Sequence, residues 1–287
     1  MIANRDPDLK QNQCRVWVLK LNKNLLSMIG VVILLIIVVF ALFAPLLTKY
    51  NPTDIYMNNR LSKLNWECPM GTDEFGRSIF SRVIYGSRIS LTVGLIVVIV
   101  TGVLGTFMGL IAGYYSFLDK FIMLIMDGLM AFPAILLGIA LAAATRASQW
   151  NVVIALSIVY IPRTVRVVRS SVLQNKEMAY IKAAKAIGAK DIRILWKHLL
   201  PNAFSSLVVQ QTFIFAYAIL AEAGLSFIGV GIPPPAPSWG NIMTEGRNYL
   251  QVAPWISFFP GLFLFMTVLS LTIVGDAVRD IFDVKQK

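Results

Sequence analysis

The sequence predicts an all-α polytopic membrane protein with six transmembrane helices. Of its 287 residues, 57% are hydrophobic and only 14% are charged, whereas soluble domains carry about 25% charged residues. Apolar runs of roughly the twenty residues that a bilayer-spanning helix requires alternate with short polar segments. These two observations exclude a soluble globule and indicate that most of the chain lies in lipid.

The apolar runs set the expected boundaries. We expect spans at 25–47, 89–113, 121–144, 150–169, 203–228 and 255–276. The first run is longer than the roughly 7–15 apolar residues of a signal peptide and lacks a clean small-x-small cleavage site, so an uncleaved anchor is favoured. The chain then divides into a cytoplasmic segment 1–24, a first helix 25–47, an extracytoplasmic loop 48–88, a five-helix core 89–278 with a polar loop at 176–201, and a cytoplasmic tail 279–287.

Basic residues orient these spans. Of the 26 Lys and Arg residues, 18 lie in the N-terminal segment, at Lys120, between Arg163 and Lys197, or in the C-terminal tail. Cytoplasmic loops collect Lys and Arg, so both termini and the 170–202 loop are expected in the cytoplasm of a multi-pass plasma (inner) membrane protein. Six of the other eight lie in the 48–88 loop, which weakens the contrast without reversing it. The net charge of +11 therefore reflects topology, and nucleic acid is not an expected partner.

Small residues recur on the second span as Gly105-x-x-x-Gly109-x-x-x-Gly113. Small residues four apart give a smooth helix face on which another helix packs closely in lipid. Internal packing is favoured over a subunit interface.

Three acidic residues, Asp127, Glu222 and Asp276, lie within or at the ends of spans. An intramembrane acid is a functional hypothesis because its burial in hydrocarbon is costly, and a proton relay is one interpretation. Structural pairing, or a side chain that reaches toward the membrane surface, is favoured because all three lie toward span ends.

A proline-rich segment, 229–240, connects the last two spans. Its prolines favour a stiff, extended backbone. It could be a ledge that receives a soluble partner or a short reentrant cap that only connects two helices, and the sequence leaves both open.

The longest cytoplasmic connection reads EMAYIKAAKAIGAKDIRILWKHLLPN, from Glu177 to Asn202. Apolar residues recur at three-to-four spacing and predict two amphipathic helices. Gly188 is expected to end the first helix with a positive φ, Asp191 to cap or charge the start of the second, and Pro201 to mark where the chain turns back into lipid. Such an elbow could fit a groove on a cytoplasmic protein or lie on anionic lipid, and physical arguments support the two interpretations equally.

This stretch resembles the EAA loop of bacterial ABC importer permeases, E-A-A-x-x-x-G followed by I/L-x-L-P. The matching residues are Ala183, Ala184, Gly188, Leu199 and Pro201, whereas Lys182 stands where the family most often has glutamate. The resemblance covers nearly the whole chain and narrows to the C-type permease of dipeptide, oligopeptide and nickel importers. It includes Gly71-Thr72-Asp73-Glu74-Phe75-Gly76-Arg77, Asp127 with Ala131-Phe132-Pro133, Leu225 to Gly229, Pro237 to Asn241, Gly275-Asp276 and Arg279-Asp280.

The resemblance implies a type I ABC importer permease fold with a cytoplasmic EAA coupling loop, and the transmembrane role in a binding-protein-dependent importer. Implied partners are a homologous second permease subunit, two ATP-binding subunits that hold ATP and Mg, and an extracytoplasmic solute-binding protein. No catalytic, cofactor or metal site is expected on this chain, which has no G-x-x-x-x-G-K-[ST] phosphate loop. The residues expected to couple to the ATPase are Lys182, Ala183, Ala184, Ile187, Gly188, Asp191, Leu199 and Pro201.

The cargo stays open among peptides, nickel and metal-chelator complexes, and spacing assigns no substrate-binding residue. An ion-driven secondary transporter with Asp127 or Glu222 as charge carrier is the main alternative. A membrane-embedded hydrolase is weaker because the lone histidine, His198, has no nucleophile motif beside it.

Overall fold

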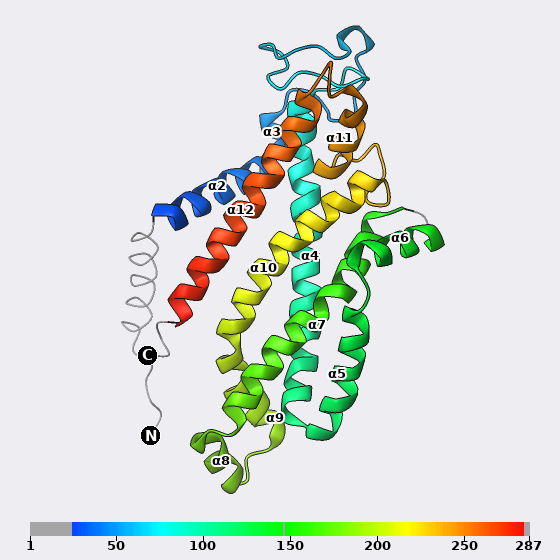
Figure 1. Cartoon of the computed structure of the whole chain (residues 1–287). Coiled ribbons are helices and arrows are strands. Elements are labelled where there is room, and N and C mark those ends of the chain that lie inside the picture. Colours follow the sequence, from blue (N-terminus) through cyan, green and yellow to red (C-terminus); the bar gives the residue numbers. More distant parts are fainter. Residues whose placement is uncertain (1–24, 146, 284–287) are drawn as a thin grey trace.

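The computed structural model describes residues 25–145 and 147–283 (Figure 1). The expected segment 1–24 and residues 284–287 of the expected tail lie outside them. The described part is helical and has no β-strand, and its elements in chain order are α2 (Leu25–Leu42), α3 (Ala44–Leu47), η1 (Met57–Asn59), α4 (Ile79–Tyr114), α5 (Ser116–Met130), α6 (Ala134–Thr145), α7 (Gln149–Lys176), α8 (Ala179–Ala186), α9 (Asp191–Ile194), η2 (Leu195–Leu199), α10 (Leu200–Ile228), α11 (Trp239–Gly246), η3 (Arg247–Tyr249) and α12 (Trp255–Asp283).

Five helical stretches in the described part are long and apolar enough to cross a membrane: α2, α4, α7, Asp191–Ile228 and α12. The pair α5 and α6 makes a sixth if it counts as one span, but its helices bend by 81°. The expected third span, 121–144, is therefore broken and not straight. Pro133 at the break lacks an amide hydrogen and disfavours helical geometry at Phe132.

The long helix α4 runs through the middle of the bundle and packs on α7 and α10, while α12 packs on α10 and α2 (Figure 1). The glycine stripe explains the tight α4–α7 contact. A Cβ atom added at Gly105, Gly109 or Gly113 would lie 2.6–2.7 Å from side-chain atoms of Thr164, Val168 or Val172 on α7. Internal packing, the favoured interpretation, is what the structure contains.

Residues 79–88, expected in the extracytoplasmic loop, form the first turns of α4. Ser78 caps this helix by accepting a hydrogen bond from the Ser81 amide. Of the polar residues that suggested a loop here, Arg82 and Ser87 are fully inaccessible to solvent, while Arg88 is exposed. The helix therefore begins ten residues before the expected span.

The end of the bundle formed by residues 48–82 and 229–254, here called the capped end, contains a buried charge network. The Asp73 carboxylate accepts hydrogen bonds from Arg77 Nε at 2.6 Å and Arg82 Nη1 at 2.8 Å. Both arginines also bind Glu245, Arg77 at 2.8 Å. Buried charges need counterions, so the network joins the loop, α4 and α11, while Arg82 Nε is left without a hydrogen-bond partner.

The proline-rich segment leads into α11, which folds inward at the capped end. Ser238 and Asn241 form a capping box at its start. Trp239 is fully buried and its Nε1 donates to the Val83 carbonyl of α4 at 3.1 Å. The end of the segment and α11 therefore pack inward, whereas Pro233, Pro234 and Pro235 are exposed.

Candidate functional site

The elbow opposite the capped end consists of α8, a glycine turn and α9. Gly188 has φ +79°, a conformation that side-chain-bearing residues rarely adopt. The Gly188 amide donates to the Lys185 carbonyl at 2.9 Å, and the Ala189 amide to the Ala184 carbonyl at 3.0 Å. These two bonds form a Schellman motif, so α8 ends where the sequence predicted.

The second helix of the elbow does not end at Pro201. Residues Leu195–Leu199 form a π-helical turn that joins α9 to α10, and Pro201 lies in the first turn of α10. Proline is tolerated in a first turn because its amide hydrogen is not required there. The expectation of a turn at Pro201 is therefore wrong, and the elbow continues without a break into a spanning helix.

Apolar side chains attach the elbow to the bundle. Ile181, Ile194 and Leu199 are fully buried and pack in one cluster with Val168 and Val172 of α7. Of the expected coupling residues, Leu199 thus belongs to the inner face of the elbow. Its role is to hold the elbow on the bundle by burial of apolar surface.

Polar contacts attach the elbow to the end of α4. The Asp191 carboxylate accepts hydrogen bonds from the hydroxyls of Tyr114 at 2.6 Å and Tyr115 at 3.1 Å, and the Lys185 ammonium lies 4.7 Å from the centre of the Tyr114 ring. The pKa of the Tyr115 hydroxyl is raised above its usual value, mainly by desolvation and to a smaller extent by its hydrogen bond to Asp191. Asp191 lies in the first turn of α9, where it adds the expected negative charge, but it makes no side-chain cap. Its carboxylate binds Tyr114 of α4 and Tyr115, which follows that helix.

The outer face of the elbow is exposed. Ile187 is 86% exposed, and Ala183 and Gly188 are exposed beside it while Ala184 is half-buried. Lys182 pairs with Glu177 at 3.3 Å, with both side chains exposed. Small residues around a protruding isoleucine give a surface that an apolar groove on another protein could contact closely.

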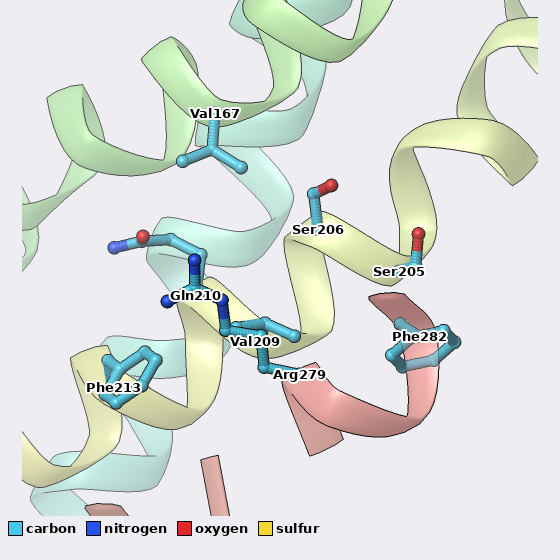
Figure 2. Close-up of a pocket in the computed structure, with 8 residues that line it drawn as sticks. All are labelled: Val167, Ser205, Ser206, Val209, Gln210, Phe213, Arg279 and Phe282. Atoms are coloured by element: carbon cyan, nitrogen blue, oxygen red, sulfur yellow. The ribbon is translucent and has the colours of Figure 1, made fainter. Parts of the chain in front are cut away.

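A second feature, which sequence reasoning missed, is a groove between α7, α10 and α12. Its cavity of about 360 Å³ (Figure 2) is lined by Val167, Ser205, Ser206, Val209, Gln210, Phe213, Arg279 and Phe282. Ser206, Gln210, Phe213 and Tyr217 follow one stripe of α10 at helical spacing. A polar stripe on a spanning helix is expensive against lipid, and the polar residues inside the apolar 203–228 run were the signal for it.

The three acids have different environments. Glu222 is fully buried, and its carboxylate accepts hydrogen bonds from the hydroxyls of Ser90 and Ser226, each at 2.8 Å. Its side chain does not reach toward the membrane surface, so that part of the expectation is wrong for Glu222. Asp127 pairs with Arg166 at 2.6 Å, as structural pairing predicted. Asp276 is exposed and lines a cavity beside α2.

His198 lies in the π-helical turn with its ring centre 6.3 Å from that of Tyr180. Among the described residues, no group of three or more His, Cys, Asp or Glu side chains could hold a metal ion.

Comparison with known proteins identifies the family. Residues 102–287 match the family described as binding-protein-dependent transport system inner membrane component, and residues 14–64 match the N-terminal transmembrane domain of oligopeptide transport permease C. The first match covers well over half of the chain.

Curated relatives agree over nearly the full length. A putative peptide transport system permease protein of Brucella abortus is 43% identical over 281 residues, which cover 98% of this chain and 95% of the relative. The dipeptide transport system permease protein DppC of Alkalihalophilus pseudofirmus is 43% identical over 93% of this chain and 88% of its own. The glutathione transport system permease protein GsiD of Pectobacterium atrosepticum is 39% identical over 99% of this chain and 94% of the relative.

Among solved structures, a chain of the MetNI methionine ABC transporter, in an inward-facing conformation, matches with a TM-score of 0.59 and 20% identity over 69% of this chain and 95% of that chain. At this identity the match shows the fold alone, a type I importer permease fold. The chain therefore belongs to the family of binding-protein-dependent transport system inner membrane components, within its C-type dipeptide and oligopeptide permease subfamily.

Proposed function

We propose that the chain is one of two transmembrane subunits of an ATP-driven peptide importer. Its partners are a homologous second permease subunit, two ATP-binding subunits that hold ATP and Mg, and an extracytoplasmic solute-binding protein. Both termini and the elbow face the cytoplasm. The observation that carries this proposal is the elbow, whose exposed Ile187 and small neighbours join directly to a spanning helix.

The elbow supplies the coupling. Because α9 continues through the π-helical turn into α10, a displacement of the elbow moves α10 as well. Leu199 and Ile194 clamp the elbow to α7, so α7 and α10, two of the three helices that border the groove, respond together. ATP binding then acts as a population shift, since the ATP-binding subunits contact one arrangement of the elbow better than the other, and rigid-body rocking opens the path to alternate sides.

The groove supplies half of the path. Polar residues of α10 such as Ser206 and Gln210 lie along its open side, where contact with lipid would be unfavourable. A second permease of similar fold, facing this groove, would enclose the path and cover the polar stripe. Named relatives that carry dipeptides and glutathione favour peptides over nickel and metal-chelator cargoes.

An ion-driven transporter is not favoured by the family match or by these contacts. Glu222 is enclosed by serine hydroxyls, and Asp127 is occupied by Arg166.

The test is to replace Gly188 by valine in the complete importer, reconstituted in vesicles. Valine cannot adopt φ +79° without strain of about 1–2 kcal/mol, and the space around Gly188 is open, so the effect is confined to the turn. We expect a loss of binding-protein-stimulated ATP hydrolysis and of at least tenfold in peptide import.

Gly188→Asn is the matched control, because asparagine tolerates the left-handed conformation, and it should retain most of both activities. Unchanged coupling in Gly188→Val would contradict the elbow mechanism. Import that continues without the ATP-binding subunits, or that collapses with an ionophore, would overturn the proposed function itself.

A further inference from the structure

Arg163 occupies an unusual place for a charged residue. It is the fifteenth of the 28 residues of α7, and at 1.5 Å per residue it lies roughly 20 Å from either end of that helix. The sequence places it on the cytoplasmic side, and in the structure it lies inside α7, where Arg166 and Arg169 follow it within two turns. It therefore lies toward the elbow-side end of the apolar part of this helix, and an ionised residue within a spanning helix is a candidate functional site.

Two aromatic rings hold the guanidinium group. Its central carbon lies 5.1 Å from the ring centre of Tyr160, one turn earlier on α7, and 5.4 Å from that of Tyr217 on α10. Stacking on aromatic faces stabilises a guanidinium and orients its plane while leaving its N–H donors free. Arg163 is also exposed, so these donors are accessible.

The neighbouring arginines of α7 are neutralised, whereas Arg163 is not. Arg166 pairs with Asp127 at 2.6 Å and Arg169 with Asp119 at 2.5 Å. Across residues 25–145 and 147–283, no carboxylate lies within ion-pair distance of Arg163. A guanidinium that has no carboxylate partner among these residues and keeps accessible N–H donors can bind an anion from outside the chain.

The site continues the groove of Figure 2. Val167 and Phe213 line the cavity. Arg163 lies one helical turn from Val167 on α7, and Tyr217 lies one turn from Phe213 on α10, in both cases on the side away from the elbow. The groove therefore presents the hydroxyl of Ser206, the amide of Gln210 and the guanidinium of Arg279, and Arg163 adds a second cation beyond Val167 and Phe213. This sequence of groups suits a polar chain that ends in a carboxylate.

We propose that Arg163, held between Tyr160 and Tyr217, binds the C-terminal carboxylate of the peptide during its passage through the groove. The inference rests on the proposed function, since it requires peptide cargo. A guanidinium binds a carboxylate through two parallel N–H···O bonds, and the aromatic rings position it for this contact.

The experiment compares two cargoes, trialanine and trialanine amide, in vesicles that contain the complete importer and its binding protein. For each cargo, import by Arg163→Gln is divided by import by the wild type, so that the preference of the binding protein cancels. We expect trialanine import to fall about tenfold, as for loss of a charge-assisted hydrogen bond, and amide import to change less than twofold. Arg163→Lys should retain more trialanine import than Arg163→Gln.

A charge-rescue measurement adds a readout that a packing role would not move. In a Cys14→Ser, Cys68→Ser background, Arg163→Cys is treated with a thiol reagent that attaches either an ethylammonium or an ethylsulfonate group. The cationic group should restore trialanine import and the anionic group should not, and the same background with Arg163 intact is the control.

An equal fall in the import of both cargoes by Arg163→Gln would overturn the inference, because it would indicate that Arg163 pairs with an acid of the second permease or with lipid. No loss of either cargo, or equal recovery with both reagents, would overturn it as well. The proposed function fails separately, if the wild-type importer shows no ATP-dependent import of either cargo.

Discussion

At the capped end, the buried Asp73, Arg77 and Arg82 join the partly buried Glu245 in one charge network, whereas beside the elbow Glu177 and Lys182 form a pair in which both side chains are exposed. Breaking a buried network leaves unpaired charges and costs several kcal/mol. An exposed pair contributes about 0–1 kcal/mol. The ion pairs of the capped end therefore stabilise one arrangement strongly, whereas the ion pair beside the elbow contributes little and the attachment of the elbow rests on the buried Ile181, Ile194 and Leu199.

The largest effect is expected from Arg82→Ala, which removes the fully buried arginine that binds both Asp73 and Glu245. We expect a loss of about 3 kcal/mol of stability because two carboxylates lose a buried counterion. The measurement is the midpoint of unfolding in detergent. Arg193→Ala, an exposed arginine of the elbow, is the control and should change stability by less than about 0.5 kcal/mol. Equal losses would remove the contrast between the two ends.

An intermediate effect is expected from Gly109→Ala. Gly109 lies in the α4–α7 contact, which joins the capped end to the elbow. The new Cβ would lie 2.7 Å from Val168 Cβ and 2.9 Å from the Val165 carbonyl oxygen, so the helices must separate, at about 1–3 kcal/mol. The same unfolding assay measures it. Gly102→Ala, whose Cβ would meet its nearest atom at 3.6 Å, should leave stability nearly unchanged. If both alanines behave alike, close approach at Gly109 is not what holds α4 on α7.

The smallest effect is expected from Asp191→Asn at the elbow. The amide still accepts from Tyr114 and Tyr115 but without its charge, so about 0.5–1 kcal/mol of local stability should be lost. Amide hydrogen exchange should become a few fold faster in α8 and α9 and stay unchanged in the 48–78 segment. Faster exchange at both ends would mean that the elbow and the capped end are one cooperative unit.

Local signals predicted the elbow well. The glycine, the three-to-four apolar spacing and the acid at Asp191 are each a property of a few consecutive residues, and the Schellman motif at Gly188 follows from them. The glycine stripe of α4 was also readable because helical spacing determines which residues share a face. The continuation through Pro201 was missed because a π-helical turn depends on packing of Leu199 and Ile194.

The groove and the buried charges could not be predicted in the same way. Arg82 reads as a loop residue until Asp73 and Glu245, which lies 163 residues away, surround it. Arg163 reads as a cytoplasmic base until α7 and α10 bring Tyr160 and Tyr217 to either side of it.

By itself the sequence determined the membrane class, the approximate spans, the family resemblance and the hinge of the elbow, because hydropathy, helical periodicity and glycine geometry act over one or two helical turns. The tertiary structure alone decided which charges are neutralised by other described residues and which, like Arg163, have no ion-pair partner among them. Coulomb interactions and desolvation depend on distance in space, and only the folded bundle sets those distances between residues far apart in the chain.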